Sequence, residues 1–128
     1  CPPFDNGTFI IDQHQLYPEN ADCDQKNCLL VCRALFNSSV AIFDPYANKM
    51  VDMLTFPGIT HNPSVHIGGV AVDPYSGLVT ILVDAAAAFA TGGADISGDY
   101  LVMKWDPTSH RVLWTVNLTA ITGGKYGG

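Results

Sequence analysis

The candidates for chemistry in this 128-residue chain are three histidines and one aspartate. His61 and His66 flank the start of one apolar segment, His14 follows another, and Asp84 ends a third. Imidazole titrates near neutral pH and serves as acid, base or ligand-binding group, and a carboxylate at a strand end can line a cavity. We therefore take these four residues as ligand-binding candidates, with capping of loop backbone as the alternative role. No catalytic residue is assigned, because a Ser-His-Asp arrangement is recognised by geometry and not by spacing.

Motifs for cofactors and metals are missing from the sequence. Nothing resembles a P-loop or a G-x-G-x-x-G dinucleotide motif. Cys23, Cys28 and Cys32 are separated by four and three residues, unlike the paired C-x2-C of zinc ribbons. We therefore expect no cofactor and no metal.

The four cysteines predict two disulfides, since their number is even. If Cys28 and Cys32 lie in one strand, their Cα atoms are about 13 Å apart, whereas a disulfide tolerates about 7 Å at most. Two connectivities remain: Cys1 with Cys28 and Cys23 with Cys32, or Cys1 with Cys32 and Cys23 with Cys28. We favour the first slightly, because it ties the amino-terminal arm to the start of a central strand.

Glycan acceptors indicate the compartment. Three N-x-[ST] sequons start at Asn6, Asn37 and Asn117, while Asn62 is excluded by the proline that follows it. Three sequons beside four cysteines favour a secreted, extracellular protein with N-linked glycans. A first residue of Cys1 instead of Met suggests a processed or trimmed product.

Composition narrows the partners. Six Lys and Arg against twelve Asp and Glu give a net charge of −6, which argues against a nucleic-acid partner. Hydrophobic residues make up 48% of the chain, but no apolar run reaches 18 residues, so no membrane partner is expected. Such a chain fits a globular protein with buried strands.

The second half of the chain, from His66 to Asn117, reads as four strands with a turn or loop after each of the first three. Asp73-Pro74 and Asp106-Pro107 form the tight turns, in which the carboxylate bonds the backbone ahead and proline fixes φ. A loop rich in small residues, 84–98, separates the middle strands, with six residues around its alanine run as the only helix-compatible piece. The predicted strands are His66–Val72, Leu78–Val83, Tyr100–Trp105 and Val112–Val116.

The first half repeats this pattern, because Asp44-Pro45 lies 62 residues before Asp106-Pro107 and each follows an aromatic residue. Residues 14–27 are rich in Pro, Asn and Asp and are predicted to be a loop. The predicted strands are Phe4–Gln13, Cys28–Phe36, Val40–Phe43 and Met50–Phe56.

The predicted fold is all-β, with two four-stranded antiparallel blades of the propeller type. Blade one covers about residues 7–57, blade two about 65–118, and 119–128 is read as a connection to a missing blade. Propellers close with about four to eight blades, so two blades make an incomplete β-propeller. Open apolar faces then need a cover, either the remaining blades of a longer chain or further copies of the protein.

Four segments carry a family resemblance: Gln15–Asp22, Phe43–Tyr46, Gly69–Pro74 and Lys104–Pro107. Together they resemble a secreted fungal β-propeller family of secondary-metabolite clusters, which includes a trichothecene-cluster protein and related hetero-Diels–Alderases. The likeness covers most of the chain, but none of these motifs is a catalytic signature. A weaker likeness of the Val-Asp-Pro turns to calcium-dependent lactonase propellers matches no calcium ligand.

The resemblance implies a secreted propeller of secondary metabolism that binds an apolar small molecule. It also implies possible catalysis of a pericyclic, hetero-Diels–Alder-type reaction, for which positioning of two reactants supplies several kcal/mol. The alternative is a structural glycoprotein that self-associates through exposed sheet faces and edges. The sequence leaves open whether the protein is an enzyme.

Overall fold

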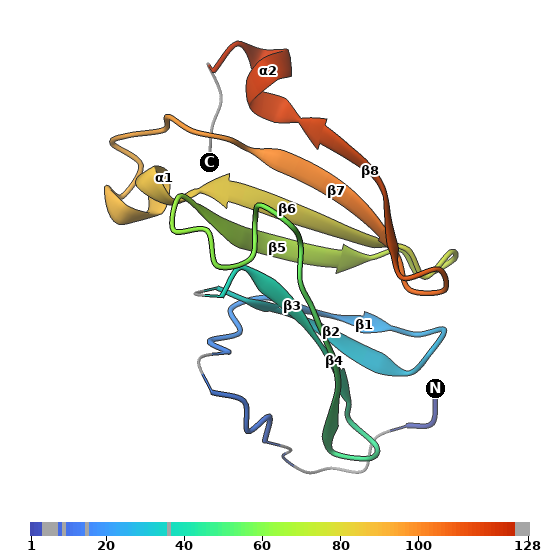
Figure 1. The fold of residues 1–128 in the computed structure, drawn as a ribbon. Coiled ribbons are helices and arrows are strands. Elements are labelled where there is room, and N and C mark those ends of the chain that lie inside the picture. Colours follow the sequence, from blue (N-terminus) through green and yellow to red (C-terminus); the bar gives the residue numbers. More distant parts are fainter. Residues whose placement is uncertain (4–7, 9, 15, 36, 125–128) are drawn as a thin grey trace.

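The structure is a computed structural model that describes residues 1–3, 8, 10–14, 16–35 and 37–124. Two four-stranded antiparallel sheets lie against each other, with two five-residue helices at their ends (Figure 1). Sheet one has the order β1 (Ala21–Asp24), β2 (Leu29–Ala34), β3 (Ser39–Asp44) and β4 (Lys49–Leu54). Sheet two has the order β5 (Val65–Val72), β6 (Val79–Ala85), β7 (Leu101–Asp106) and β8 (Arg111–Asn117), with α1 (Ala86–Ala90) and α2 (Leu118–Thr122). The prediction of two four-stranded antiparallel sheets is confirmed.

The first predicted strand is wrong. Thr8, Ile10 and Ile11 belong to no strand, and residues 4–7 and 9 of that prediction lie outside the described residues. Sheet one instead takes its remaining strand, β1, from the segment 14–27 that was predicted to be a loop. Its polar side chains face sheet two. The position of this strand is therefore fixed by hydrogen bonds to β5, described next, and not by the burial of apolar side chains.

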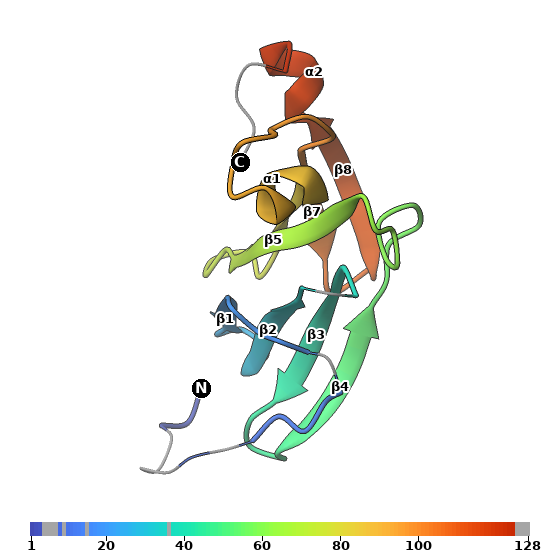
Figure 2. The same ribbon diagram turned by 90° about the vertical axis from the view of Figure 1, so that its left-hand side faces the viewer.

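β1 joins the two sheets through side chains that replace a neighbouring strand. The Val70 N–H donates to Asn20 Oδ1 at 2.6 Å, and the Val72 N–H donates to Asp22 Oδ2 at 2.8 Å. These two amides lie on β5, which in the described part of the chain has a strand partner on its other edge only, so the side chains satisfy donors that would otherwise lack a partner. β1 and β5 are thereby held side by side (Figure 2).

The main core lies between the sheets. Val31, Val40 and Ile42 of sheet one pack with Ile81 and Trp105 of sheet two in one buried cluster. Burial of such side chains contributes about 1.5–3 kcal/mol each relative to exposure. This face therefore fixes how the sheets stack.

The other faces of the two sheets differ. On sheet one, the segment before β1 places Leu16, only 4% exposed, against Cys32 and Ala41. On sheet two, register places Leu82 and Trp114 on one face, where they remain 43% and 47% exposed. β6 therefore alternates between buried and more exposed side chains, because only one of its faces meets sheet one.

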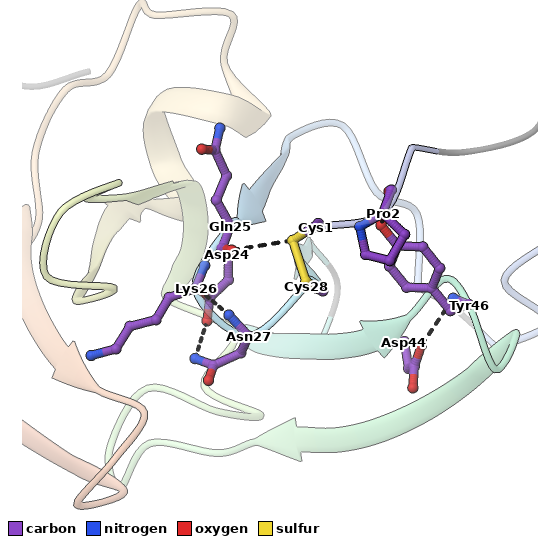
Figure 3. The surroundings of a disulfide bond; sticks show 9 residues. All are labelled: Cys1, Pro2, Asp24, Gln25, Lys26, Asn27, Cys28, Asp44 and Tyr46. Carbon is purple, nitrogen blue, oxygen red and sulfur yellow. Dashed lines mark hydrogen bonds between the residues drawn. A yellow bond between two sulfur atoms is a disulfide. The ribbon is translucent and has the colours of Figure 1, made fainter.

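The arm over sheet one is tied down by a disulfide (Figure 3). Cys1 and Cys28 are bonded, with Cα atoms 5.4 Å apart, and the Tyr46 hydroxyl donates to the Pro2 carbonyl at 2.6 Å. Cys23 and Cys32 are free thiols, so the predicted bond between them is not formed. They lie diagonally across β1 and β2, since Cys23 pairs with Leu30 and not with Cys32.

The aspartate turns have the predicted geometry. The Asp44 carboxylate accepts the N–H groups of the second and third residues after it at 2.9 Å each, and Asp73 does the same at 2.8 and 3.0 Å. Asp106 accepts the Thr108 N–H at 2.8 Å. Each turn is thus specified by its own side chain.

Within the described residues, neither helix is long and apolar enough to cross a membrane. The same residues contain no group of three or more His, Cys, Asp or Glu side chains placed to hold a metal ion.

Candidate ligand pocket

The structure brings two of the four candidate residues together. His66 on β5 and Asp84 on β6 are cross-strand partners. His61 is exposed in the connection between β4 and β5, where its N–H donates to the Asn37 carbonyl at 3.1 Å. His14 is exposed in a turn before β1. Only the first two line the pocket described next.

A pocket of about 270 Å³ lies where the two sheets meet α1, and we call it the Arg33 pocket. Sheet two supplies His66, Gly68 and Asp84, and the side of sheet one supplies Glu19 and Arg33. Its apolar wall consists of Leu35, Ala85, Ala88 and Phe89. The lining therefore combines charged side chains with apolar ones, as in typical small-molecule sites.

Arg33 crosses from sheet one to sheet two. Its side chain is buried, with Nη1 donating to the Ile67 carbonyl at 2.9 Å and Nη2 paired with the Glu19 carboxylate. The Nε–H is buried and has no partner within the described part of the chain. An unsatisfied buried donor costs about 1–3 kcal/mol, which makes this N–H a candidate donor for a ligand acceptor.

His66 presents a second unpartnered atom. Its Nδ1 is buried without a hydrogen-bond partner among the described residues. Its ring meets Phe89 of α1 edge to face, with centroids 5.7 Å apart. The short alanine-rich helix thus positions an aromatic side chain over the polar end of β5.

Asp84 occupies space that only a glycine leaves open. A Cβ on Gly68 would lie 1.5 Å from Asp84 Oδ2. Burial raises the pKa of Asp84 above its usual value, while the charges of Arg33 and His66 oppose that rise. None of the side-chain hydrogen bonds found within the described residues involves this carboxylate.

Tyr100, just before β7, interacts electrostatically with Asp84, although it is not among the lining residues of the Arg33 pocket. Its hydroxyl is buried and lacks a partner in the described chain, and its pKa is raised by burial and then by the charges of Asp84 and Asp95. The buried polar atoms without a partner in the described residues are Arg33 Nε, His66 Nδ1 and Tyr100 Oη. All three belong to residues that interact electrostatically with Asp84. Buried polar atoms without partners and perturbed pKa values are features that functional sites share, so this cluster is the candidate site.

A larger groove of about 520 Å³ opens at the opposite end of the sheets, between Val31, Val79 and Trp105. Asp24 lines it, but its carboxylate already accepts the Lys26 and Asn27 N–H groups at 3.0 and 3.1 Å and the Asn27 amide at 2.7 Å. Because its buried carboxylate is satisfied, this groove is the weaker candidate.

Glu19 and Arg33 are pocket residues that the sequence did not single out. Arg33 is a lone charge in an otherwise apolar strand, which is a signal for a buried, paired cation. Glu19 lies in a polar segment and carries no comparable signal.

Two fungal proteins are similar to this chain over its full length. It is 31% identical to Trichothecene biosynthesis protein 14 of Trichoderma arundinaceum and 29% identical to Core trichothecene cluster (CTC) protein 14 of Fusarium sporotrichioides. The chain spans 38% and 36% of the lengths of these relatives. No protein-family model matches it.

A solved structure supports the fold. The allergen Mala s 1 of Malassezia sympodialis, a β-propeller, matches 85% of this chain with a TM-score of 0.74, at 15% identity and over 34% of its own chain. The two stacked sheets are therefore β-propeller-like.

Proposed function

We propose that this chain contributes a small-molecule site of fungal secondary metabolism, and that the site is the Arg33 pocket. The observation that carries the proposal is the gathering of three unpartnered buried polar atoms around Asp84. The trichothecene-cluster proteins that resemble the whole chain support the metabolic setting.

The walls of the pocket define the ligand. Leu35, Ala88 and Phe89 suit an apolar skeleton, while Arg33 Nε–H offers a donor to an oxygen on that skeleton. An oxygenated terpenoid fits this division better than the purely apolar molecule expected from the sequence. A hetero-Diels–Alder-type reaction is the proposed chemistry, because holding two reactants and polarising a carbonyl need few titratable groups.

The two sheets are, in this proposal, neighbouring blades of an incomplete β-propeller. β1 and β5 would be the innermost strands, and the Arg33 pocket would open at their ends. Remaining blades, from a longer chain or from further copies, would close the ring and complete the walls of the site.

Thermal unfolding with and without farnesol, a sesquiterpene alcohol, tests this function. A ligand that binds only the folded state raises the melting temperature. We expect stabilisation of the wild type and of His61→Gln, whose side chain lies outside the pocket, and its loss in His66→Gln. Equal stabilisation of all three proteins, or none in the wild type, would contradict the proposed site.

A second candidate function is self-association as a structural glycoprotein. It is favoured by Leu82 and Trp114, which form an exposed apolar face on sheet two where sheet one has its amino-terminal cover. Sedimentation velocity of the wild type and of Trp114→Glu decides this candidate. A monomeric wild type at high concentration would reject it.

We also propose a secretory location with N-linked glycans. Asn37 lies before β3, and Asn117 caps α2 by accepting the Ala120 N–H at 2.9 Å; Asn6 lies outside the described residues. Intact mass before and after glycosidase treatment measures occupancy directly.

A further inference from the structure

We propose that Asp84 is the proton-bearing residue of the Arg33 pocket, and that its neutral carboxylic acid donates a hydrogen bond to an oxygen of an uncharged ligand. The ligand class is accordingly a carbonyl, hydroxyl or ether compound, and not an amine. This inference rests on the proposed function of the pocket and adds the protonation state and the polar group that is recognised.

The position of Asp84 supports a role in binding. Its carboxyl group lies over the backbone of Gly68, lines the pocket, and takes part in no side-chain hydrogen bond found within the described residues. A structural carboxylate in this protein looks different, since Asp24 has three donors around it. Asp84 therefore has hydrogen-bonding capacity that the fold does not use.

The charges around Asp84 come from each element that packs beside it. Arg33 of β2 is paired with Glu19, which precedes β1, so the two charges largely offset each other. β5 contributes His66, and the segment before β7 contributes Tyr100. The five residues of α1 include no titratable side chain. Among the described residues, no cation is thus paired with Asp84 alone, and burial favours its neutral form.

The same surroundings disfavour a cationic ligand. An ammonium group has donors and no acceptor, so it cannot accept a hydrogen bond from Arg33 Nε–H. A neutral oxygen can instead accept hydrogen bonds from Arg33 Nε–H and from the Asp84 carboxylic acid at once. The hydrogen bond leaves the proton on Asp84, so no oxidant, reductant or leaving group is needed.

The test is calorimetric titration of the full chain with farnesol and with farnesylamine between pH 5 and pH 8. Binding that requires protonated Asp84 weakens by up to about tenfold for each pH unit above the pKa of that group. We expect this trend for farnesol, and weaker binding of farnesylamine at each pH.

Two variants separate the donor from the rest of the site. Asp84→Asn keeps an N–H donor, so it should hold the affinity that the wild type shows at low pH and lose the pH dependence that belongs to Asp84. Asp84→Ala should bind farnesol more weakly at low pH.

A carbon-13 NMR titration of the Asp84 carboxyl group adds a readout that a structural role would not change. Linkage requires that a ligand preferring the neutral acid raises the pKa of Asp84 when it binds. A lowered pKa, farnesol affinity that rises with pH, or preference for farnesylamine would overturn the inference while leaving a ligand pocket in place. Failure of both probes to bind would overturn the proposed function and this inference together.

Discussion

The two ends of the stacked sheets differ in how far their polar side chains are hydrogen-bonded within the fold. At the end with the tight turns, the carboxylates of Asp24, Asp73 and Asp106 accept backbone N–H groups. At the end with the Arg33 pocket, Asp84 has no such partner among the described residues, and within the same part of the chain Arg33 and His66 each keep a buried polar atom unpaired. The carboxylates at the turn end thus have hydrogen-bond donors within the fold. At the pocket end, buried polar atoms lack partners among the described residues, and this is where we propose a ligand.

Removing the Cys1–Cys28 disulfide, which lies at the turn end, should cause the largest loss of stability among these variants. The Cys1→Ser/Cys28→Ser variant opens a link across 27 residues. The loop-closure relation predicts a loss of about 3–4 kcal/mol in the free energy of unfolding. Phe89→Ala at the pocket end, where the side chain is 60% exposed, should change it by less than about 0.5 kcal/mol. Urea denaturation measures the unfolding free energy of both variants. Similar losses in the two would contradict the proposed difference between the two ends.

Alanine at matched aspartates sharpens the comparison. Asp24→Ala leaves the Lys26 and Asn27 N–H groups without acceptors, and we expect a loss of about 2–3 kcal/mol in unfolding free energy. Asp84→Ala removes a half-buried carboxyl group that takes part in no side-chain hydrogen bond within the described residues, and should leave stability at pH 7 unchanged or higher. A larger loss for Asp84→Ala would show that this carboxylate is structural after all.

The pH dependence of stability should have opposite signs at the two ends. Bonds from Ser109 and Thr108 lower the pKa of Asp106, so its contribution is present at neutral pH and is lost as the pH falls through that lowered pKa. Burial raises the pKa of Asp84, so its contribution is present in acid and is lost as the pH rises through that raised pKa. Asp84→Asn should therefore stabilise the protein at pH 7 but not below about pH 4, near the unfolded value. Asp106→Asn should destabilise it at pH 7, and the difference should vanish in acid.

Alanine at two adjacent glycines should have a small effect on stability and the most local one. In Gly68→Ala the new Cβ displaces the end of the Asp84 side chain, while in Gly69→Ala the nearest atom is 3.5 Å away, an ordinary contact. Both should change unfolding free energy by less than about 1 kcal/mol. Only Gly68→Ala should shift the carboxyl carbon signal of Asp84 and abolish farnesol binding. An unchanged Asp84 signal in Gly68→Ala would contradict the idea that Gly68 positions the Asp84 carboxyl group.

The turn end was largely predictable from the sequence, because its information is local. Asp-Pro pairs and alternating strands predict the turns at Asp73 and Asp106 without knowledge of distant contacts. The edge strand β1 was not predictable, since it is polar and is held by the bonds that Asn20 and Asp22 accept from Val70 and Val72 on sheet two.

At the pocket end, His66 and Asp84 were named from their places at strand ends, but not as partners. The register of β5 against β6 brings them together, and only the stacking of the sheets adds Arg33 and Glu19. Sites formed by long-range packing leave a weak trace in one sequence, here a single arginine in an apolar strand.

The Arg33 Nε–H signal in a proton–nitrogen NMR spectrum gives the most direct measurement of the central claim. If this buried donor awaits a ligand oxygen, farnesol should shift that signal strongly and leave the Trp114 indole signal of the open face unchanged. An unmoved Arg33 signal, with shifts at Trp114 instead, would contradict a ligand site between the sheets.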